Sequence, residues 1–412
     1  MKPLSPQNTD RHEGELSAIS TDWAASADLT RRKALGQYMT PRTVRDQLLD
    51  QLPLWPGIRV LDPGVGSGEF LRSVLDREPT AQVVGWDVDP EILQSAARLV
   101  PEADLEERSA LTPYTGEHFD LVIGNPPYFQ FKAPIEIKRQ FGQVISGRPN
   151  IFALFFQAGM DVVKPGGRLA YVVPPSMNNG AYFEALREYI VSRAEIEYLS
   201  VLDGSGLFTD ANTAVQLIVI RSGSPSRSFT FARVAEDVGF RRTIFAVDPA
   251  ALESQFRGRQ SLWELGYSAA TGTVVWNQNR EKLRREPCDG AVPLIWAHNI
   301  RGGHVELDPE HPKRPQYVVT NDALCGPAVV VNRIVGSVGS ADLRCAPVAP
   351  GDQFVGENHV NVIAARPEVE QRTSWAQLLE MLQSPQIVER VRLLTGNTQV
   401  SASELNHLIP LG

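Results

Sequence analysis

The chain has 412 residues, of which 42% are hydrophobic, and carries a formal net charge of −8. This length predicts about two domains with large buried cores, and no apolar run in the sequence is long enough to span a bilayer. The acidic balance argues mildly against a protein that wraps nucleic acid, although local basic clusters, not the total charge, set such a footprint. The first 22 residues are polar and lack an apolar secretion core, which predicts a cytoplasmic protein.

The cysteines and histidines show no spacing typical of a metal site. Cys288, Cys325 and Cys345 lie far apart in the sequence and are odd in number, so we expect reduced, structural thiols. The seven histidines form no closely spaced pair. The sequence therefore predicts no bound metal.

In chain order, the first strong signal is a predicted strand at 58–62 followed by a glycine-rich loop. The loop contains Pro63, Gly64 and Gly66 and precedes an apolar helical run. Glycines there let a ligand approach the backbone without interference from Cβ atoms. A second predicted strand leads into Asp87, at roughly the 20-residue spacing of an acid that binds ribose hydroxyls. The pattern predicts a nucleoside-binding site.

The last residue of the first strand, Asp62, narrows the choice of ligand. A loop that binds pyrophosphate presents backbone N–H groups and a helix N-terminus to the phosphates, and a neighbouring carboxylate would repel them. A carboxylate suits an ammonium group instead, such as the α-amino group of S-adenosylmethionine. Asp62 therefore favours that cofactor over a dinucleotide.

A third predicted strand, 119–124, ends at the tetrapeptide Asn125-Pro126-Pro127-Tyr128. The asparagine amide oxygen and a backbone carbonyl are held rigid by the prolines, and two fixed acceptors suit one NH2 group. The tyrosine offers a flat apolar face to a planar group. The tetrapeptide predicts a site for a base amine or a side-chain amide. The alternative is a strand that merely stops at a Pro-Pro turn.

The rest of this half alternates helices and strands. We expect a helix at 150–163, a strand at 168–173, a helix at 181–192, and strands at 196–202 and 213–221. This alternation predicts an α/β fold with a doubly wound, Rossmann-like sheet. A small polar run at 223–228 is the predicted linker, which separates a catalytic domain at 1–222 from a second domain at 229–412.

Together these segments resemble the S-adenosylmethionine-dependent DNA adenine-N6 methyltransferases, and more narrowly their gamma class, which includes type II modification methylases of the TaqI, PstI and BsuBI type. The segment 36–41, Gly-Gln-Tyr-Met-Thr-Pro, resembles the one that precedes the glycine-rich loop in this class and folds over the methionine end of the cofactor. The resemblance implies a seven-stranded methyltransferase sheet followed by a mixed α+β target-recognition domain.

The resemblance also implies roles for individual residues. The catalytic tetrapeptide is Asn125, Pro126, Pro127 and Tyr128, and Tyr128 with Phe208 is expected to sandwich the target base. The residues implied in cofactor binding are Tyr38, Thr40, Asp62, Pro63, Gly64, Gly66, Asp87, Val88, Ser109 and Asn125. Phe155 resembles an aromatic residue near the cofactor, although a core role fits its amphipathic run at least equally well.

Ser109 departs from the family pattern. An acidic residue is expected at this position, where it accepts a hydrogen bond from the adenine amine of the cofactor. A serine hydroxyl can accept the same bond, but a neutral acceptor makes a weaker one. We therefore expect weaker cofactor binding and no loss of activity.

The C-terminal part resembles the target-recognition region of the PstI and BsuBI type in three patches, 293–303, 356–361 and 396–401. Their Asn, Gln, Arg and His side chains are suited to base edges and phosphates. The DNA-recognition candidates are Asn299, Arg301, Arg333, Asn358, His359, Asn397 and Gln399. Any single asparagine among them can instead be a turn residue.

The predicted function is site-specific transfer of a methyl group from S-adenosylmethionine to N6 of a flipped adenine in double-stranded DNA, as the modification component of a restriction-modification system. No nuclease motif is visible in the sequence, so a cognate restriction endonuclease would act separately. The alternatives are a protein glutamine-N5 or ribosomal RNA base methyltransferase, which use the same Asn-Pro-Pro-Tyr chemistry, and a non-enzymatic DNA-binding subunit.

Overall fold

The computed structural model describes residues 15–147, 149–202, 214–235, 240–333, 343–395 and 399–412. The chain divides into two compact units. The first unit comprises residues up to Phe231 together with Thr243–Val247, and the second comprises Ala232–Arg242 and Asp248–Gly412. The sequence-based domain limits stay a prediction; their linker at 223–228 ends just before the first change of unit.

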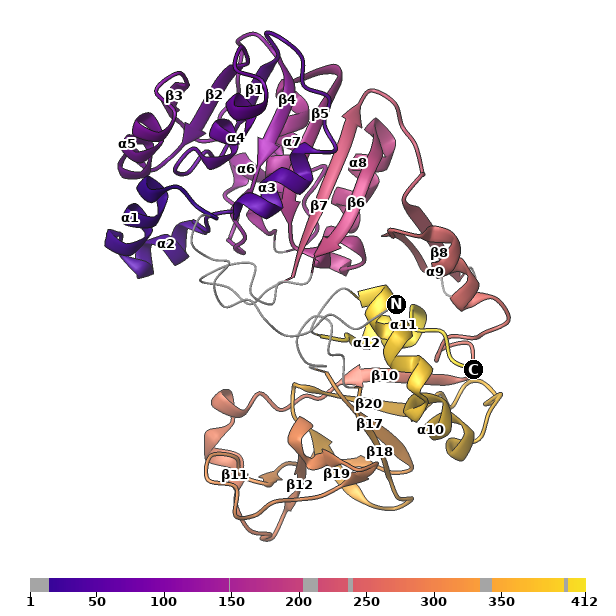
Figure 1. Ribbon diagram of the computed structural model, residues 1–412. Helices are drawn as coiled ribbons and strands as arrows, with labels where there is room; N and C mark the ends of the chain where they lie inside the picture. The colour runs from indigo at the N-terminus through magenta and orange to yellow at the C-terminus, as the bar shows by residue number, and fades with distance from the viewer. Residues whose placement is uncertain (1–14, 148, 203–213, 236–239, 334–342, 396–398) are drawn as a thin grey trace, which may run out of the picture. The chain divides into compact units, whose positions relative to one another are not determined.

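The first unit is built around one seven-stranded sheet (Figure 1). Its strands are β1 (Arg59–Asp62), β2 (Gln82–Asp87), β3 (Asp104–Glu107), β4 (Phe119–Gly124), β5 (Val163–Val173), β6 (Ala194–Leu202) and β7 (Val215–Ser222). Their order is β3-β2-β1-β4-β5-β7-β6, and β7 runs antiparallel to both of its neighbours, whereas the other pairs are parallel. The predicted α/β, doubly wound, seven-stranded fold is confirmed.

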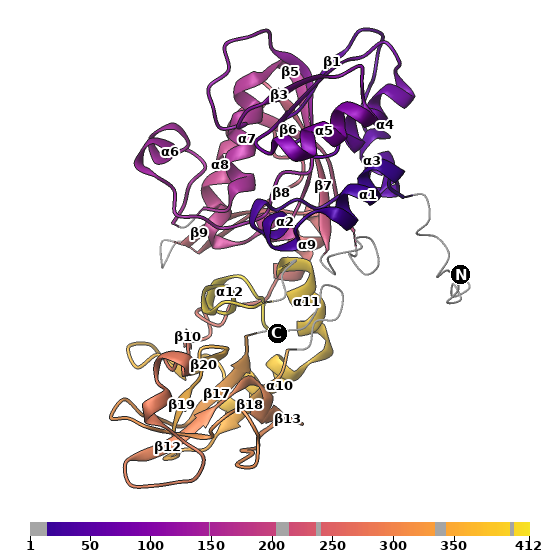
Figure 2. The same ribbon diagram turned by 90° about the vertical axis from the view of Figure 1, so that its left-hand side faces the viewer.

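Helices cover both faces of this sheet (Figure 2). They are α1 (Ala18–Ser26), α2 (Leu29–Leu35), α3 (Arg42–Leu49), α4 (Glu69–Arg77), α5 (Pro90–Leu99), α6 (Ile135–Gln140), α7 (Ile151–Val162) and α8 (Glu184–Arg193). One core cluster joins α3 and α4 to the sheet, and another joins α7 and α8 to its opposite face. Two buried apolar layers therefore fix the positions at which the strands end.

Local sequence explains where these helices begin. Gly68, with φ of +90°, ends the glycine-rich loop and precedes α4, whose buried Phe70, Leu71 and Val74 recur at helical spacing. Asp89 caps α5 by accepting a hydrogen bond from the backbone N–H of Glu91. Each cap lies next to a strand end, so the loops between strand and helix are short.

One strand of the sheet was not predicted from the sequence. β3, with the sequence Asp-Leu-Glu-Glu, lies at the edge of the sheet and buries little of its surface. An edge strand with three acidic residues has no apolar alternation for a sequence pattern to detect. The predicted strand at 119–124 has the same limits as β4.

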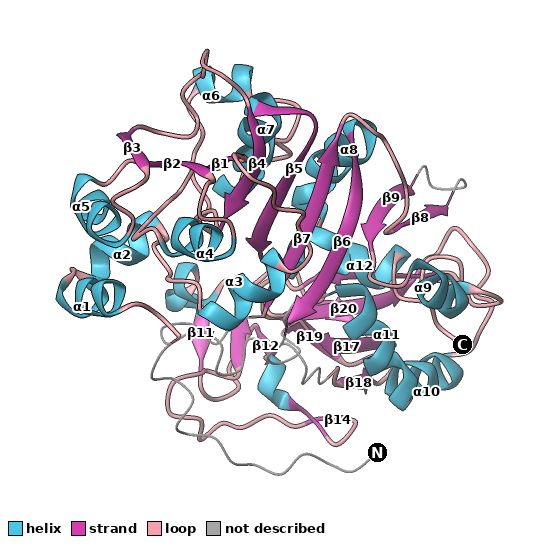
Figure 3. Ribbon diagram, turned by 45° about the horizontal axis from the view of Figure 1, so that its top comes forward, coloured by secondary structure: helices cyan, strands magenta, loops and turns pink. Residues whose placement is uncertain are grey.

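The second unit is a mixed α+β assembly of smaller sheets, as predicted (Figure 3). An antiparallel sheet contains β10 (Tyr267–Thr271), β20 (Val360–Ala365), β17 (Ala328–Asn332) and β18 (Cys345–Val348). A five-stranded sheet contains β11 (Leu283–Arg284), β15 (Tyr317–Val319), β12 (Ala291–Ile295), β19 (Gln353–Gly356) and β16 (Leu324–Cys325). A two-stranded ribbon pairs β13 (Ile300–Arg301) with β14 (His304–Val305). A further ribbon pairs β8 (Thr230–Ala235) with β9 (Phe240–Phe245), and each of these two strands contains residues of both units.

The helices of the second unit come mostly late in the chain. They are α9 (Pro249–Phe256), α10 (Trp375–Gln383), α11 (Pro385–Thr395) and α12 (Ala402–His407). α10 contacts β18 and α12 contacts β10. In the described part of the chain, no helix combines the length and apolar character needed to cross a membrane. Of the three unpaired cysteines, Cys345 is buried and the other two are exposed.

Candidate active site

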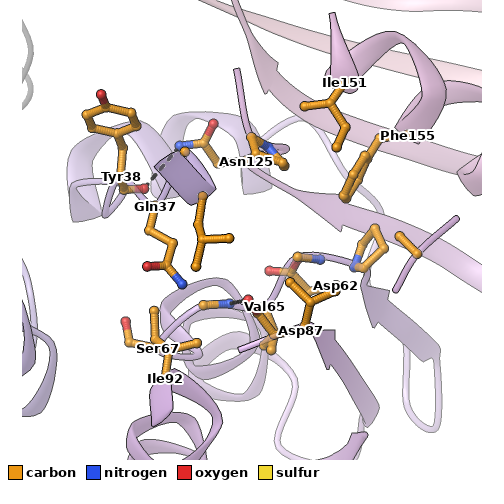
Figure 4. Close-up of a pocket in the computed structure, with 18 of the residues that line it drawn as sticks. Gln37, Tyr38, Asp62, Val65, Ser67, Asp87, Ile92, Asn125, Ile151 and Phe155 are labelled. Carbon is orange, nitrogen blue, oxygen red and sulfur yellow. Dashed lines mark hydrogen bonds between the residues drawn. The ribbon is translucent and has the colours of Figure 1, made fainter. Parts of the chain in front are cut away.

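The candidate site lies where β1 and β4 end side by side. Both strands are parallel, but the chain winds outward from them in opposite directions, which makes this the topological switch point of the sheet. Ligands of open α/β sheets bind at such points, beyond the carboxyl ends of the strands. A pocket with about 930 Å³ of empty space, part of it open to solvent, occupies this place (Figure 4).

All ten residues expected to bind the cofactor line this one pocket. Lining residues that the sequence reasoning did not single out include Gln37, Met39, Val65, Ser67, Ile92, Arg108 and Ile151. Most of these flank expected positions and could have been found as neighbours in the sequence. Ile92, on α5, carried no such signal, because only the fold brings that helix beside the glycine-rich loop.

Asp62 is the buried acid of the pocket. The residue is 2% exposed, and its Oδ1 accepts a hydrogen bond of 3.1 Å from the backbone N–H of Gly64. Burial raises the pKa of Asp62 to about 8. The neighbouring strand end contributes Gly124, where a Cβ atom would lie 2.6 Å from Asp62 Oδ1. A side chain at position 124 would therefore displace the carboxyl group.

Asp87 closes the adjacent side of the glycine-rich loop. Its Oδ2 accepts a hydrogen bond of 3.0 Å from the N–H of Gly66, and its Oδ1 accepts one of 3.0 Å from the N–H of Asp89. Burial raises the pKa of Asp87 as well. Each carboxylate oxygen keeps a second lone pair, so both remain able to accept from a ligand hydroxyl. The next residue, Val88, lines the pocket with 54% of its surface exposed.

The segment 36–41 is tied to the catalytic loop at two points. Gly36, with φ of +66°, packs so closely that a Cβ atom would lie 2.8 Å from the Cβ atom of Pro127. Asn125 Nδ2 donates to Thr40 Oγ1 at 3.0 Å and to the Tyr38 carbonyl at 3.3 Å (Figure 4). A carbonyl only accepts, so this contact fixes which end of the Asn125 amide is nitrogen.

A buried ion pair holds the segment 36–41 in place. Arg45 Nη1 lies 2.7 Å from Glu69 Oε2 and donates to the Thr40 carbonyl at 2.7 Å. Arg45 Nε also donates to Ser73 Oγ at 3.0 Å. Because Glu69 is the first residue of α4, the segment 36–41 is anchored to the helix that follows the glycine-rich loop.

The Tyr128 hydroxyl contacts the other end of the Asn125 amide. It donates to Asn125 Oδ1 and lies 2.7 Å from the carbonyl oxygen of Val172. The Tyr128 ring meets Phe152 edge to face at 6.2 Å. No described residue donates a hydrogen bond to the Pro126 carbonyl oxygen. The amide is thus oriented at both ends, and the oxygens of Asn125 and Pro126 keep acceptor capacity.

Ser109 and Phe155 both line the pocket. Ser109 Oγ accepts a hydrogen bond of 3.2 Å from the N–H of Leu111, so its hydroxyl also serves its own turn. Phe155 is 6% exposed and belongs to the core cluster on the α7 face, while its ring edge would lie 3.4 Å from a Cβ atom at Gly64. Phe155 therefore serves the core and the pocket together. Phe208 and Asn397 lie outside the described residues.

One DNA-recognition candidate does not fit its expected role. Asn299 is 0% exposed, and its amide oxygen accepts from the N–H of Trp296 at 2.8 Å. Its Nδ2 donates to the Glu306 carbonyl at 2.7 Å and to Gln316 Oε1 at 2.8 Å. A buried amide with these bonds cannot reach a base edge. Asn299 is a structural residue, as the turn alternative allowed.

The structure brings other candidates together. Arg333 donates to the Asn358 carbonyl at 3.2 Å through Nη1, and its N–H donates to the His359 carbonyl at 2.8 Å. The His359 ring is 44% exposed, and its Nδ1 lies 2.9 Å from the buried Glu357 carboxylate. Gln399 is exposed, and the neighbouring N–H of Val400 donates to the Arg333 carbonyl at 2.8 Å. Arg301 is also exposed, on the separate β13–β14 ribbon.

Several known proteins are similar to this chain in sequence. The Eco57I restriction-modification methylase family matches residues 87–208. Modification methylase CviBIII of Paramecium bursaria Chlorella virus NC1A is 26% identical over 53% of this chain and 58% of its own length. Type II methyltransferase M.BsuBI of Bacillus subtilis is 23% identical over 92% of this chain and 87% of its own length. Type II methyltransferase M.PstI of Providencia stuartii is 21% identical over 93% of this chain and 88% of its own length.

Solved structures are similar at lower levels. A class I S-adenosylmethionine-dependent methyltransferase from Listeria monocytogenes has 20% identity and a TM-score of 0.43, covering 50% of this chain and 65% of its own. The type IIG restriction endonuclease BpuSI has 14% identity and a TM-score of 0.43, covering 93% of this chain and 58% of its own.

The strand order, with β7 antiparallel, and the pocket at the switch point define a methyltransferase of the class I, S-adenosylmethionine-dependent fold. Within that class, the family match and the relatives confirm the predicted relationship to type II DNA methyltransferases of restriction-modification systems. They do not favour a glutamine or ribosomal RNA methyltransferase.

Proposed function

We propose that this chain is a site-specific DNA methyltransferase that modifies N6 of an adenine flipped out of double-stranded DNA. The observation that carries the proposal is the amide of Asn125, which is oriented at both ends and belongs to a residue that lines the pocket. An exocyclic amine offers two hydrogens to acceptors, and the oxygens of Asn125 and Pro126 supply two.

The pocket residues fit S-adenosylmethionine. Asp62 provides a buried acid for an ammonium group, and Asp87 provides two oxygens for ribose hydroxyls. Gly64 and Gly66 leave room along the loop, since a Cβ atom at Gly64 would already touch the Phe155 ring at 3.4 Å. When bound there, the cofactor supplies an electrophilic methyl group.

Adenine N6 is a poor nucleophile, and residues of this chain are proposed to activate it. The lone pair of adenine N6 is delocalised into the ring, and the amine lies inside the duplex until the base is extruded, at a cost of a few kcal/mol. Hydrogen bonds from N6 to the Asn125 amide oxygen and the Pro126 carbonyl draw the nitrogen toward tetrahedral geometry and free its lone pair. This is electrostatic preorganisation, because both acceptors are fixed before the base arrives.

The aromatic ring of Tyr128 is the stacking partner of the extruded base, with Phe208 as its proposed counterpart. Stacking contacts of this kind contribute about 1 to 3 kcal/mol per base. No general base is required before transfer, since the amine becomes acidic once it carries the additional methyl group. Tyr128 therefore combines two roles, a ring for the base and a hydroxyl for the Asn125 amide.

The second unit is proposed to bind the DNA and to choose its sequence. The candidate contacts, to base edges or to phosphates, are Arg301, Arg333, Asn358, His359, Asn397 and Gln399. The relatives named as type II methyltransferases support a role in modification, and a cognate restriction endonuclease would be a separate protein. The proposed location is the cytoplasm, where the DNA substrate and S-adenosylmethionine are both present.

The test is methylation of duplex DNA by the purified chain, with the modified nucleoside identified by mass spectrometry. We expect N6-methyladenine at one sequence. Asn125→Ala should lower the single-turnover rate by about 10²- to 10³-fold while cofactor binding stays nearly intact, because Asn125 acts on the target amine.

The matched control is Asn321→Ala, which removes an exposed asparagine of the second unit. It should leave the rate unchanged. A product methylated on cytosine or on protein would contradict the adenine assignment, and an Asn125→Ala rate above a tenth of that of the unchanged chain would contradict the role of the amide.

A further inference from the structure

Five cationic or titratable nitrogen side chains gather on one surface of the second unit, and we call them the cationic cluster. They are Arg285, His298, Arg301, His311 and Arg314. They come from three separate segments: the loop after β11, the residues around β13, and the loop before β15. No sequence pattern joined them, since 29 positions separate the first from the last.

The members of the cationic cluster are in direct contact. Arg314 Nη1 lies 3.0 Å from His298 Nδ1, and the rings of His298 and His311 are 4.6 Å apart. Arg301 Nε donates to the His298 carbonyl at 2.8 Å. Arg285 donates to the His311 carbonyl at 3.1 Å. These bonds order the side chains without neutralising any of their charge.

The cationic cluster lacks carboxylate partners. Among the described residues, Arg285, Arg301 and Arg314 form no ion pair, whereas Arg233 and Arg366 of the same unit pair with glutamates. The three arginines are exposed, and the contacts named above leave N–H donors of each guanidinium free for a ligand. Unpaired cations held close together repel one another, and an anion placed among them removes that repulsion.

A buried amide pair positions the loops that carry the cationic cluster. Gln316 is 0% exposed, and its Oε1 accepts from Asn299 Nδ2 at 2.8 Å and from the N–H of Asp308 at 3.0 Å. Its Nε2 donates to the Arg314 carbonyl at 2.8 Å. The N–H of Trp296 donates to Asn299 Oδ1 and the Glu306 carbonyl accepts from Asn299 Nδ2, so this pair links the backbone at residues 296, 306, 308 and 314. The cations therefore sit on a rigid support.

We propose that the cationic cluster binds the phosphate backbone of duplex DNA. This inference rests on the proposed function, because it takes DNA as the substrate. Arginine guanidinium groups match phosphate oxygens in geometry and charge. Phosphate contacts fix the register of a protein on the duplex without reading its sequence. The cationic cluster would thus position the DNA, and other side chains would read the bases.

The state of His298 agrees with an anion site. Burial, followed by the charges of Arg314, His311 and Arg301, lowers the pKa of His298 to about 4, while Asp308 acts weakly in the opposite direction. His298 is therefore neutral at pH 7 in the free protein. A phosphate beside it would raise that pKa, so the ring titration reports directly on whether an anion is bound.

The test uses the full chain with the double substitution Arg301→Gln and Arg314→Gln. We expect about tenfold weaker binding to a random 20-base-pair duplex and an equal loss for the cognate duplex, with the salt slope of the affinity reduced by about 0.9 for each phosphate contact removed. The affinity for S-adenosylmethionine should stay unchanged, because the residues that line its pocket all belong to the first unit.

Two further variants keep the result interpretable. Arg372→Gln removes an exposed arginine of the same unit outside the cationic cluster. It should change neither the duplex affinity nor its salt slope. Arg301→Lys with Arg314→Lys keeps the charge and should retain most of the salt slope. An unchanged slope in the glutamine variant, a loss restricted to the cognate duplex, or an equal loss in Arg372→Gln would each overturn the inference. If the unsubstituted chain bound no DNA, the proposed function would fail with it.

Discussion

The two units of this chain use arginine in different ways. In the first unit, arginines pair with carboxylates: Arg31, Arg42, Arg45, Arg59, Arg72, Arg77, Arg108, Arg168, Arg187 and Arg221. In the second unit, several donate only to backbone carbonyls: Arg284, Arg285, Arg301 and Arg333. The net charge of −8 is therefore a poor guide to DNA binding here. Acidic side chains pair with arginines chiefly in the first unit, which contains the candidate active site.

Physical separation of the two units should have the largest effect. A fragment of residues 1–247 should bind S-adenosylmethionine and lose all preference between specific and random duplexes, if the second unit alone reads sequence. The structure sets this limit, because Thr243 belongs to the first unit and its carbonyl accepts from the buried Arg187 at 2.5 Å. Competition binding at one salt concentration measures the preference.

The matched fragment, residues 1–228, lacks Thr243 and should be less stable by about 1 to 3 kcal/mol, the cost of an unsatisfied buried donor. Thermal unfolding compares the two. Full site preference in a folded fragment of residues 1–247 would refute the division of labour between the units.

The next effect concerns the chemistry of the first unit alone. Thr40→Val removes the acceptor that fixes Asn125 Nδ2, in a residue that is only 4% exposed. We expect the transfer rate to fall by about 10- to 100-fold, since a lost buried partner costs about 1 to 3 kcal/mol. Thr40→Ser keeps the hydroxyl and should restore the rate.

Binding measurements sharpen this result. Cofactor and duplex affinities should differ little between the Thr40 variants if Thr40 acts through Asn125. A Thr40→Val rate within twofold of the unchanged chain would show that the Tyr38 carbonyl suffices to orient the amide.

Cofactor binding should depend on pH through Asp62. Its pKa is raised to about 8, so its neutral form prevails at pH 7, and the stability that this protonation contributes is lost as pH rises through 8. The positive charge of the cofactor favours the carboxylate, so affinity should rise between pH 6 and 8 by up to about tenfold per unit. Calorimetry in buffers of different ionisation enthalpy should detect proton release below pH 8. Asp62→Asn should abolish the pH dependence, and a flat profile in the unchanged chain would exclude this linkage.

The smallest expected effect is at Ser109. An aspartate can keep the bond to the N–H of Leu111 with one oxygen and offer the other to the cofactor adenine amine. Ser109→Asp should therefore tighten cofactor binding several-fold, since a charged acceptor makes a bond about twice as strong. Ser109→Ala is the control. Equal affinities in all three forms would assign adenine recognition to another residue.

The sequence predicted the centre of the first unit well, because its signals are local. Strand β4 and the loop after it are adjacent in sequence, so an apolar run and two prolines suffice to locate them. The hydrogen bonds of Asn125 to Tyr38 and Thr40 join residues more than 80 positions apart and required the fold. Thr40 was expected to touch the cofactor only, and its bond to the catalytic amide was missed.

The second unit was less accessible to sequence reasoning. Asn299 was predicted to contact DNA because its residue type suits base edges and phosphates. Burial decides its role instead, and the burial of one asparagine cannot be read from the sequence. The cationic cluster was not foreseen, because its members belong to three segments that only the loops bring together.

The buried amides of Asn299 and Gln316 have a consequence for how such a protein diversifies. They hold the backbone at residues 296, 306, 308 and 314 by bonds that do not involve the exposed side chains of Arg301 or Arg314. Surface positions can then be exchanged one at a time during evolution or redesign, and the affinity for DNA is tuned without refolding the loops. Among relatives that share this loop arrangement, positions 299 and 316 should be invariant, while the charges above them vary from lineage to lineage.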